Sequence, residues 1–221
     1  MVNGVKLSRR IKLLSGFALF AAGIALLFPP LYSEVIQTNI QSGEQQKQAQ
    51  ELSKVLESKK PGKPAANDSF AVIYIPRFGS EFRRPIAEGT SVKEVLDTVG
   101  IGHYLGTAMP NEVGNFALAS HRTTHGGAFN HIDQLVEGDQ IYVEFEQGWT
   151  TYEVVNSSVV APNDTWVIGT NPLNRPEDKW ITLTTCTPRY TTEKRLIVWG
   201  KQTEFRSRED GPPTELDQLI R

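Results

Sequence analysis

Three side chains with the chemistry for acyl transfer each lie at one end of a predicted strand. Cys186, the single cysteine of the chain, follows the strand-like run 180–185. His121 follows the run 115–120 in the same way, and Arg195 opens a further apolar run. A thiolate attacks carbonyl carbons, an arginine beside it favours the thiolate and binds an oxyanion, and an imidazole carries protons to and from amines. These residue types suit a covalent acyl transfer.

The spacing of these residues is compatible with one shared site. Eight residues separate Cys186 from Arg195, so antiparallel pairing of the two flanking strands brings both side chains to the same end of a sheet. Each residue also has a plainer interpretation, as a buried thiol, a solvent-facing edge charge or a structural histidine. The catalytic interpretation is favoured because all three occur at strand ends within one β-rich domain.

A metal centre is the rival interpretation of the same region. His121, His125 and His131 are close in sequence, and three histidines can hold a catalytic zinc ion. However, Gly126, Gly127 and Asn130 interrupt the helix that would align them, and no acidic residue has the spacing of a known metal motif. We therefore predict no metal and no cofactor.

The elements that must position these residues are mostly short strands. Apolar runs bounded by turn residues recur at spacings of about ten residues, which favours a closed or sandwiched β structure over residues 69–204. Only residues 92–99 and 129–135 have the pattern of helical turns. The tail 205–221 is charged, contains two consecutive prolines and is predicted to be loose. The strand-like runs are 71–75, 115–120, 140–145, 150–155, 158–161, 180–185 and 196–203.

The N-terminal region has the pattern of a membrane anchor. Residues 13–31 contain no charged side chain, and four basic residues stand within 1–12. A helix of about 20 apolar residues spans a bilayer, and preceding basic residues favour a cytoplasmic N-terminus. We expect a transmembrane helix that Pro29 and Pro30 end, with the catalytic domain extracellular. A cleaved signal peptide is the alternative, although the sequence after the run lacks the small residues of a cleavage site.

Residues 32–68 are predicted to be an extracellular stalk or linker. They are rich in Gln, Glu and Lys, and a helix over 44–57 would have only a narrow apolar stripe. Prolines at 61 and 64 would interrupt any helix there. The formal net charge of the whole chain is −2, so a nucleic-acid partner is not expected.

The residues around Cys186 resemble those of sortases, the cysteine transpeptidases of Gram-positive bacteria. The sequence Thr182-Leu183-Thr184-Thr185-Cys186 is similar to their T-L-x-T-C motif. Arg195 lies where the family places its arginine, and Ala119-Ser120-His121-Arg122 resembles its histidine strand. The resemblance covers about residues 70–203. Residues 102–110 and 186–189 look most like the class E housekeeping group of actinobacteria.

The resemblance implies an eight-stranded β-barrel and a thioacyl mechanism. By analogy, Cys186 attacks the Thr–Gly bond of an LAXTG or LPXTG sorting signal on a secreted surface protein, His121 protonates the leaving amine, and Arg195 stabilises the oxyanion. A lipid II or peptidoglycan amine would then resolve the thioester. Tyr104 resembles a tyrosine linked to the LAXTG preference, and Thr185 is a weaker candidate for shaping the oxyanion site. The acidic residues of calcium-binding members have no counterpart here.

Three alternatives to a housekeeping sortase stay open on the sequence. A pilin-polymerising sortase would use a pilin lysine as acceptor, but residues 61–69 lack the lid motif of such enzymes. An L,D-transpeptidase would carry a Ser-His-Gly-Cys motif, which is absent around Cys186. A non-catalytic, membrane-anchored binding module would have no need to keep His121, Cys186 and Arg195 together.

Overall fold

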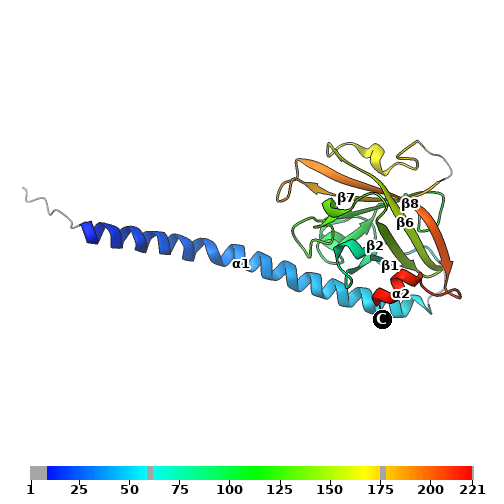
Figure 1. Cartoon of the computed structure of the whole chain (residues 1–221), viewed down its shortest axis with the longest axis horizontal. Helices are drawn as coiled ribbons and strands as arrows, with labels where there is room; N and C mark the ends of the chain where they lie inside the picture. The colour runs from blue at the N-terminus through cyan, green and yellow to red at the C-terminus, as the bar shows by residue number, and fades with distance from the viewer. Residues whose placement is uncertain (1–8, 59–61, 175–177, 221) are drawn as a thin grey trace, which may run out of the picture. The chain divides into compact units, whose positions relative to one another are not determined.

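A closed barrel of eight strands forms the main body of the chain (Figure 1). The computed structural model describes residues 9–58, 62–174 and 178–220, without the side chains of residues 9–11, 24–31 and 218–220. Two compact units can be distinguished by their internal contacts, Met1–Gln37 and Thr38–Arg221. The second unit holds every candidate residue of the sequence analysis.

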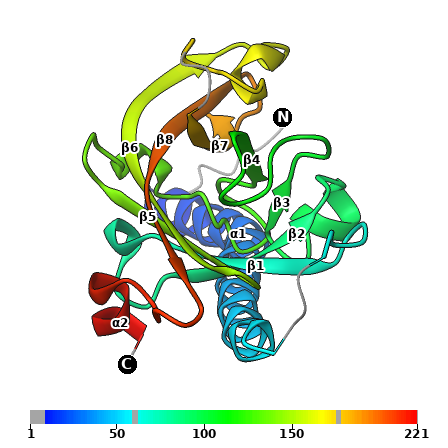
Figure 2. The same cartoon turned by 90° about the vertical axis from the view of Figure 1, so that its right-hand side faces the viewer.

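The strands follow the order β1-β2-β3-β4-β7-β8-β6-β5 around the barrel (Figure 2). The β2–β3 and β4–β7 pairs are parallel, and the other pairs are antiparallel. The strands are β1 (Ser69–Tyr74), β2 (Arg83–Glu88), β3 (Ile101–His103), β4 (Gly114–Ser120), β5 (Gln140–Phe145), β6 (Gly148–Val160), β7 (Lys179–Thr187) and β8 (Lys194–Ser207). The helices are α1 (Arg9–Leu56), η1 (Pro76–Phe78), η2 (Val92–Leu96), η3 (Ile132–Gln134), η4 (Thr165–Ile168) and α2 (Thr214–Ile220).

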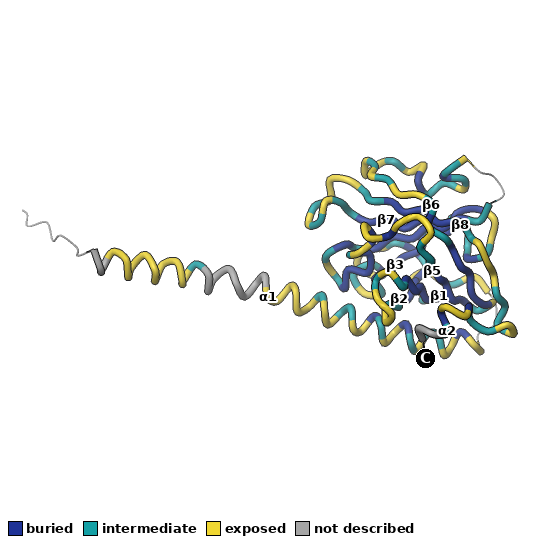
Figure 3. Tube along the Cα trace, in the orientation of Figure 1, coloured by how far each residue is buried: buried dark blue, intermediate teal, exposed yellow. Residues whose placement is uncertain are grey.

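Buried residues predominate along the barrel strands (Figure 3). Their apolar side chains fill the barrel and cover parts of its outside. Inward-facing residues such as Leu118, Ile181 and Leu183 belong to the main core. A second cluster joins Ala49 and Leu56 of α1 and Leu216 of α2 to the outer side of β1, β5 and β6. A third cluster, around Trp199, lies under η4. This two-sided burial fixes the strand register, because a slip by one residue would turn every side chain to the wrong face.

The predicted β-barrel with short helices is confirmed, but several element boundaries differ from the sequence prediction. The runs 150–155 and 158–161 are one strand, β6, which bends at irregularities in its pairing with β8. Strands β2 and β3 were not predicted; β2 contains Pro85, and β3 has only three residues. Strands β2 and β3 can be recognised only from their pairing with neighbouring strands. Neither contains an alternating apolar pattern long enough to identify a strand from the sequence.

The expected transmembrane helix over 13–31 is not confirmed. Among the described residues, no helix combines the length and apolar character needed to cross a membrane. Part of the expected segment, the side chains of residues 24–31, lies outside the described residues. The expectation that Pro29 and Pro30 end a helix is wrong, since α1 continues from Arg9 to Leu56. A proline removes one intrahelical hydrogen bond, and the regular turns on both sides can carry the helix past that loss.

The segments expected to be a plain stalk and a loose tail both contain packed structure. Gln45, Ala49 and Leu56 of α1 are buried within the second unit. Strand β8 extends to Ser207, and Leu216 of α2 is fully buried. A narrow apolar stripe is enough to hold a helix when it packs onto an apolar patch outside a barrel, and the sequence of the helix does not indicate that patch.

Candidate active site

Pairing of β7 with β8 sets Cys186 directly opposite Arg195. Residues directly opposite in an antiparallel pair have their side chains on the same face, with Cβ atoms about 4.5–5.5 Å apart. Cys186 is partly exposed. The strand ends and the connecting loop therefore place a thiol and a guanidinium side by side, as the sequence predicts.

Pairing of β4 with β7 brings His121 to the same place. The parallel register joins Ala119 to Thr184 and β4 ends at Ser120, so one step beyond the strand His121 comes level with Cys186. The Thr185 hydroxyl donates a hydrogen bond to the Ser120 carbonyl at 2.8 Å and holds this end of the two strands together. Three residues far apart in sequence thus meet at one end of β4, β7 and β8.

The thiol belongs to the outer face of the barrel. Ile181 and Leu183 of β7 point into the main core, and side chains alternate along a strand. Thr182, Thr184 and Cys186 therefore face outward. The Cys186 side chain therefore does not point into the barrel core.

Tyr104 lies on the same outer surface, close to the thiol. Its hydroxyl is 3.1 Å from Oγ1 of Thr184, the residue two positions before Cys186 on the same face of β7. Thr184 in turn donates to the Leu118 carbonyl at 3.0 Å. The structure therefore places the Tyr104 hydroxyl against the outer face of β7.

Thr185 does not face the thiol side. It is 3% exposed, it alternates with Cys186 along β7, and its hydroxyl is used on the Ser120 carbonyl. The side chain is therefore a positioning element for the end of β4. Strand alternation turns the Thr185 hydroxyl to the face opposite the thiol, whereas a contribution of the Thr185 backbone to an oxyanion site stays a prediction.

Arg195 keeps its charge available for a substrate. Its guanidinium donates to the carbonyl oxygens of Thr192 and Lys194, both at 3.0 Å. It forms no ion pair with a carboxylate among the residues that the structure describes. A positive charge not neutralised in this way can stabilise an oxyanion beside Cys186.

Asp97 is a site residue that the sequence analysis missed. One of its carboxylate oxygens lies 2.8 Å from Nε2 of His121 and 3.5 Å from Nδ1 of His125. The two imidazole rings have their centroids 5.0 Å apart. Asp97 directly follows η2, 24 positions before His121, so no spacing in the sequence links them. His131 is exposed and hydrogen-bonds with Gln134 instead, so the three histidines considered in the sequence do not form one cluster.

Arg122 is a second site residue that the sequence analysis missed, and it hydrogen-bonds to the end of β7 that carries Cys186. It is buried, and its Nη1 donates to Oγ1 of Thr187 at 2.8 Å and to the Cys186 carbonyl at 3.5 Å. Its Nη2 pairs with Asp133 at 3.1 Å, and Arg189 reaches the same carboxylate at 3.4 Å. Partial burial raises the pKa of Asp133, but a backbone hydrogen bond and the two arginines outweigh it and hold that pKa below its usual value.

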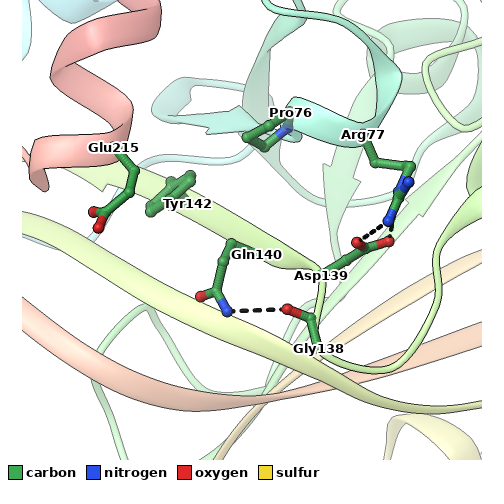
Figure 4. A pocket seen from close by; sticks show the side chains of 7 residues that line it. All are labelled: Pro76, Arg77, Gly138, Asp139, Gln140, Tyr142 and Glu215. Atoms are coloured by element: carbon green, nitrogen blue, oxygen red, sulfur yellow. Dashed lines mark hydrogen bonds and ion pairs between the residues drawn. The ribbon is translucent and has the colours of Figure 1, made fainter.

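A separate surface pocket of about 510 Å³ is not a competing active site (Figure 4). It lies between η1, the start of β5 and α2, and Arg77 and Asp139 in its wall neutralise each other in an ion pair. Its other lining residues are Pro76, Gly138, Gln140, Tyr142 and Glu215. None of these offers a nucleophile beside a proton carrier, so the chemistry of the chain is better placed at Cys186.

Comparison with known proteins agrees with this geometry. Residues 73–203 match the family model described as "Sortase domain". Sortase SrtE1 of Streptomyces coelicolor is 41% identical over 165 residues, which cover 71% of this chain and 46% of that protein. Sortase SrtE2 of the same organism is 35% identical over 170 residues, covering 71% of this chain and 65% of the other. The alignments thus span less than two thirds of these relatives' own lengths.

Solved structures give the same result. The crystal structure of sortase E1 from Streptomyces coelicolor with a tripeptide in its active site superposes with a TM-score of 0.63 at 39% identity, covering 70% of this chain and 99% of that chain. Sortase E from Streptomyces avermitilis gives a TM-score of 0.63 at 37% identity, with 69% and 99% covered. The family model covers more than half of the chain, and the predicted resemblance to class E members is confirmed. This chain belongs to the sortase family.

Proposed function

We propose that this chain is a membrane-anchored cysteine transpeptidase that joins secreted surface proteins to a cell-wall precursor. The observation that carries the proposal is the strand register, which sets Cys186 opposite Arg195 and level with His121 on the outer face of the barrel. Membership of the sortase family supports the reaction type.

The reaction begins with attack of the Cys186 thiolate on the carbonyl carbon between Thr and Gly of a sorting signal. A carbon–sulfur bond forms, and Arg195 stabilises the negative charge on the oxygen. The carbon–nitrogen bond then breaks as the protonated imidazole of His121 gives its proton to the leaving glycine amine. The product is a thioester on Cys186 and a neutral His121.

An amine resolves the thioester in the second half of the reaction. Its nitrogen attacks the thioester carbon, His121 takes the excess proton, and the carbon–sulfur bond breaks to restore the thiolate. The proposed donor of this amine is lipid II or peptidoglycan. The proposed signal is of the LAXTG type, with Tyr104 over β7 as a contact for the peptide, since its hydroxyl already lies against Thr184.

The decisive experiment incubates the full chain with LAXTG and LPXTG peptides, with and without a glycine-containing amine. We expect a thioacyl adduct on Cys186 by mass spectrometry, loss of the adduct in Cys186→Ala, and a ligated product when the amine is present. A non-catalytic binding module would give no adduct, and full turnover by Cys186→Ala would refute the mechanism. A product formed only with a lysine side-chain amine would favour a pilin-polymerising enzyme instead.

We also propose that residues 13–31 anchor the chain in the cell membrane as a single span, with the catalytic domain extracellular. The apolar run and the basic residues before it support this topology. Cys186 is the only cysteine, so a membrane-impermeant thiol reagent reports its side of the membrane directly. We expect labelling in intact cells and none in Cys186→Ala. Labelling that requires cell lysis would contradict the topology.

A further inference from the structure

Three side chains beside the thiol have the composition of a transition-metal site. One ligand atom each of Asp97, His121 and His125 lies within 4.8 Å of the others. Asp97 follows η2, His121 follows β4, and His125 lies in the loop that continues from it. The proposed transfer reaction uses only His121 of these three, so the role of the cluster is not explained by it.

The spacing of the cluster fits a tetrahedral ion. Zinc bonds of about 2.0–2.1 Å to nitrogen and oxygen place neighbouring ligand atoms about 3.3 Å apart. The Asp97 oxygen is 2.8 Å from Nε2 of His121 and 3.5 Å from Nδ1 of His125, on either side of this value. The two imidazole nitrogens lie within 4.8 Å of each other, so the partly exposed His125 ring would have to move toward His121 to complete the three-ligand set.

His125 carries two signs of a functional constraint. Its Nδ1 atom is hidden from solvent and makes no hydrogen bond among the described residues, although the Asp97 oxygen is near. Its backbone has a φ of +50°, in the left-handed region that side-chain-bearing residues seldom adopt. A bound cation would give this unsatisfied nitrogen, 3.5 Å from a carboxylate oxygen, a partner.

The buried side-chain amide of Gln45 hydrogen-bonds to both loops that carry Asp97 and His125. Nε2 of Gln45 donates to the His125 carbonyl at 3.0 Å and to the Thr98 carbonyl at 3.4 Å. Gln45 is 1% exposed, and an added Cβ at Gly100 or Gly126 would collide with it. This support fixes the loops bearing Asp97 and His125 relative to each other before any ion binds, which favours affinity.

The donor set indicates which ions fit. Two imidazole nitrogens and one carboxylate oxygen match zinc and similar first-row ions, whereas calcium and magnesium prefer oxygen ligands alone. The side chains are 24% to 40% exposed, so an ion and a completing water molecule can reach the site from solvent.

We propose that Asp97, His121 and His125 bind one Zn²⁺ ion, and that this ion inhibits the enzyme. Coordination at Nε2 of His121 prevents protonation of that nitrogen, so the imidazole can no longer cycle between its neutral and protonated forms. The binding part of the proposal stands on the cluster itself, whereas the inhibition part rests on the proposed function.

Binding is tested in the full chain carrying Cys186→Ala, so that no thiol contributes. Co²⁺ serves as a coloured probe whose visible absorption reports tetrahedral coordination, and Zn²⁺ is titrated in as its competitor. We expect one ion per chain, with affinity reduced by at least about tenfold in His125→Asn and in Asp97→Asn. The matched control is His131→Asn, which removes an exposed histidine away from the cluster and should leave the affinity unchanged. Equal affinity in His125→Asn and its parent, or no binding at all, overturns the site.

Inhibition is tested with Cys186 intact, as the ratio of thioacyl formation with and without Zn²⁺ within each variant. The Zn²⁺ concentration for half inhibition should rise at least about tenfold in His125→Asn and not in His131→Asn. Equal sensitivity in His125→Asn and the wild type would mean that Zn²⁺ acts on the thiolate, and would overturn the proposed inhibition. If the wild type forms no adduct even without metal, the proposed function fails and the inhibition with it, while the Co²⁺ result still decides the binding site.

Discussion

At the scale of single residues, the position of Cys186 depends on buried neighbours that bond to the end of β7. Arg122 is buried below the end of β7 and bonds to both Cys186 and Thr187 through one nitrogen. Asp133 holds the other side of the same guanidinium. Positioning of the thiol therefore relies on the buried charge of Arg122, whose own partner, Asp133, lies in η3.

Replacing Arg122 should reduce both activity and stability. Arg122→Ala leaves the Asp133 carboxylate with one arginine fewer and the Thr187 hydroxyl without its partner, at a cost of about 1–3 kcal/mol in unfolding free energy. We expect slower adduct formation on Cys186, measured by mass spectrometry at early times. Arg189→Ala is the control: it also faces Asp133 but bonds to Asn130 instead of β7, so the rate of adduct formation should change much less.

Asp133 should make stability depend on acid pH. Its folded-state pKa lies below the usual 3.8, so its stabilising contribution is complete above that value and is lost as pH falls through the lowered folded pKa. In Asp133→Asn we expect a smaller loss of unfolding free energy between neutral pH and about pH 3, measured by urea denaturation. An identical acid dependence in the variant and the wild type would contradict this assignment.

At the scale of elements, the last part of α1 belongs to the catalytic unit. Ala49 and Leu56 pack on β1, β5 and β6, and Ser53 donates a hydrogen bond of 2.7 Å to the buried carboxylate of Glu144. The same carboxylate accepts from Tyr74 and from Arg208 near the C-terminus. Gln45 reaches the loops beside His121. This helix end is therefore joined both to the barrel wall and to the site.

Truncation should reveal this dependence. A chain of residues 38–221 keeps the whole compact second unit, whereas one of residues 57–221 loses the packed helix end. Removing Leu56 alone from its buried position costs about 1.5–3 kcal/mol. We expect the shorter chain to have a clearly lower Tm by calorimetry and a lower rate of adduct formation. Equal melting of the two chains would show that the helix packing contributes nothing.

At the scale of the whole molecule, the closed barrel makes the site depend on a distant core. Leu183 is fully buried in the main core and lies between Thr182 and Thr184, whose side chains face the opposite side of β7. Its packing therefore fixes the register that sets Cys186 against Arg195. Because the sheet has no free edge, a defect at this strand is shared by β4 and β8 on its two sides.

A cavity at Leu183 should weaken the entire fold. Leu183→Ala is expected to lower the unfolding free energy by about 2–5 kcal/mol in a single cooperative transition. Leu105→Ala removes the same atoms from a side chain that is 68% exposed, and its effect should be much smaller. Comparable losses in the two variants, measured by chemical denaturation, would contradict the placement of Leu183 in the core.

Local sequence patterns were enough to predict strand ends next to His121 and Cys186, a strand start next to Arg195, and a β structure of the sortase type. Short apolar runs, turn residues and a specific motif each involve residues that are neighbours in the sequence. They can therefore be recognised without knowledge of the fold. The face on which the thiol lies, the opposite orientation of Thr185 and the place of Asp97 and Arg122 in the site became visible only in the folded chain. The same holds for the packing of the end of α1 on the barrel. These features depend on contacts between residues far apart in the chain. Burial on both sides of the sheet determines which of these residues pair, and the spacing of residues in the sequence does not reveal it.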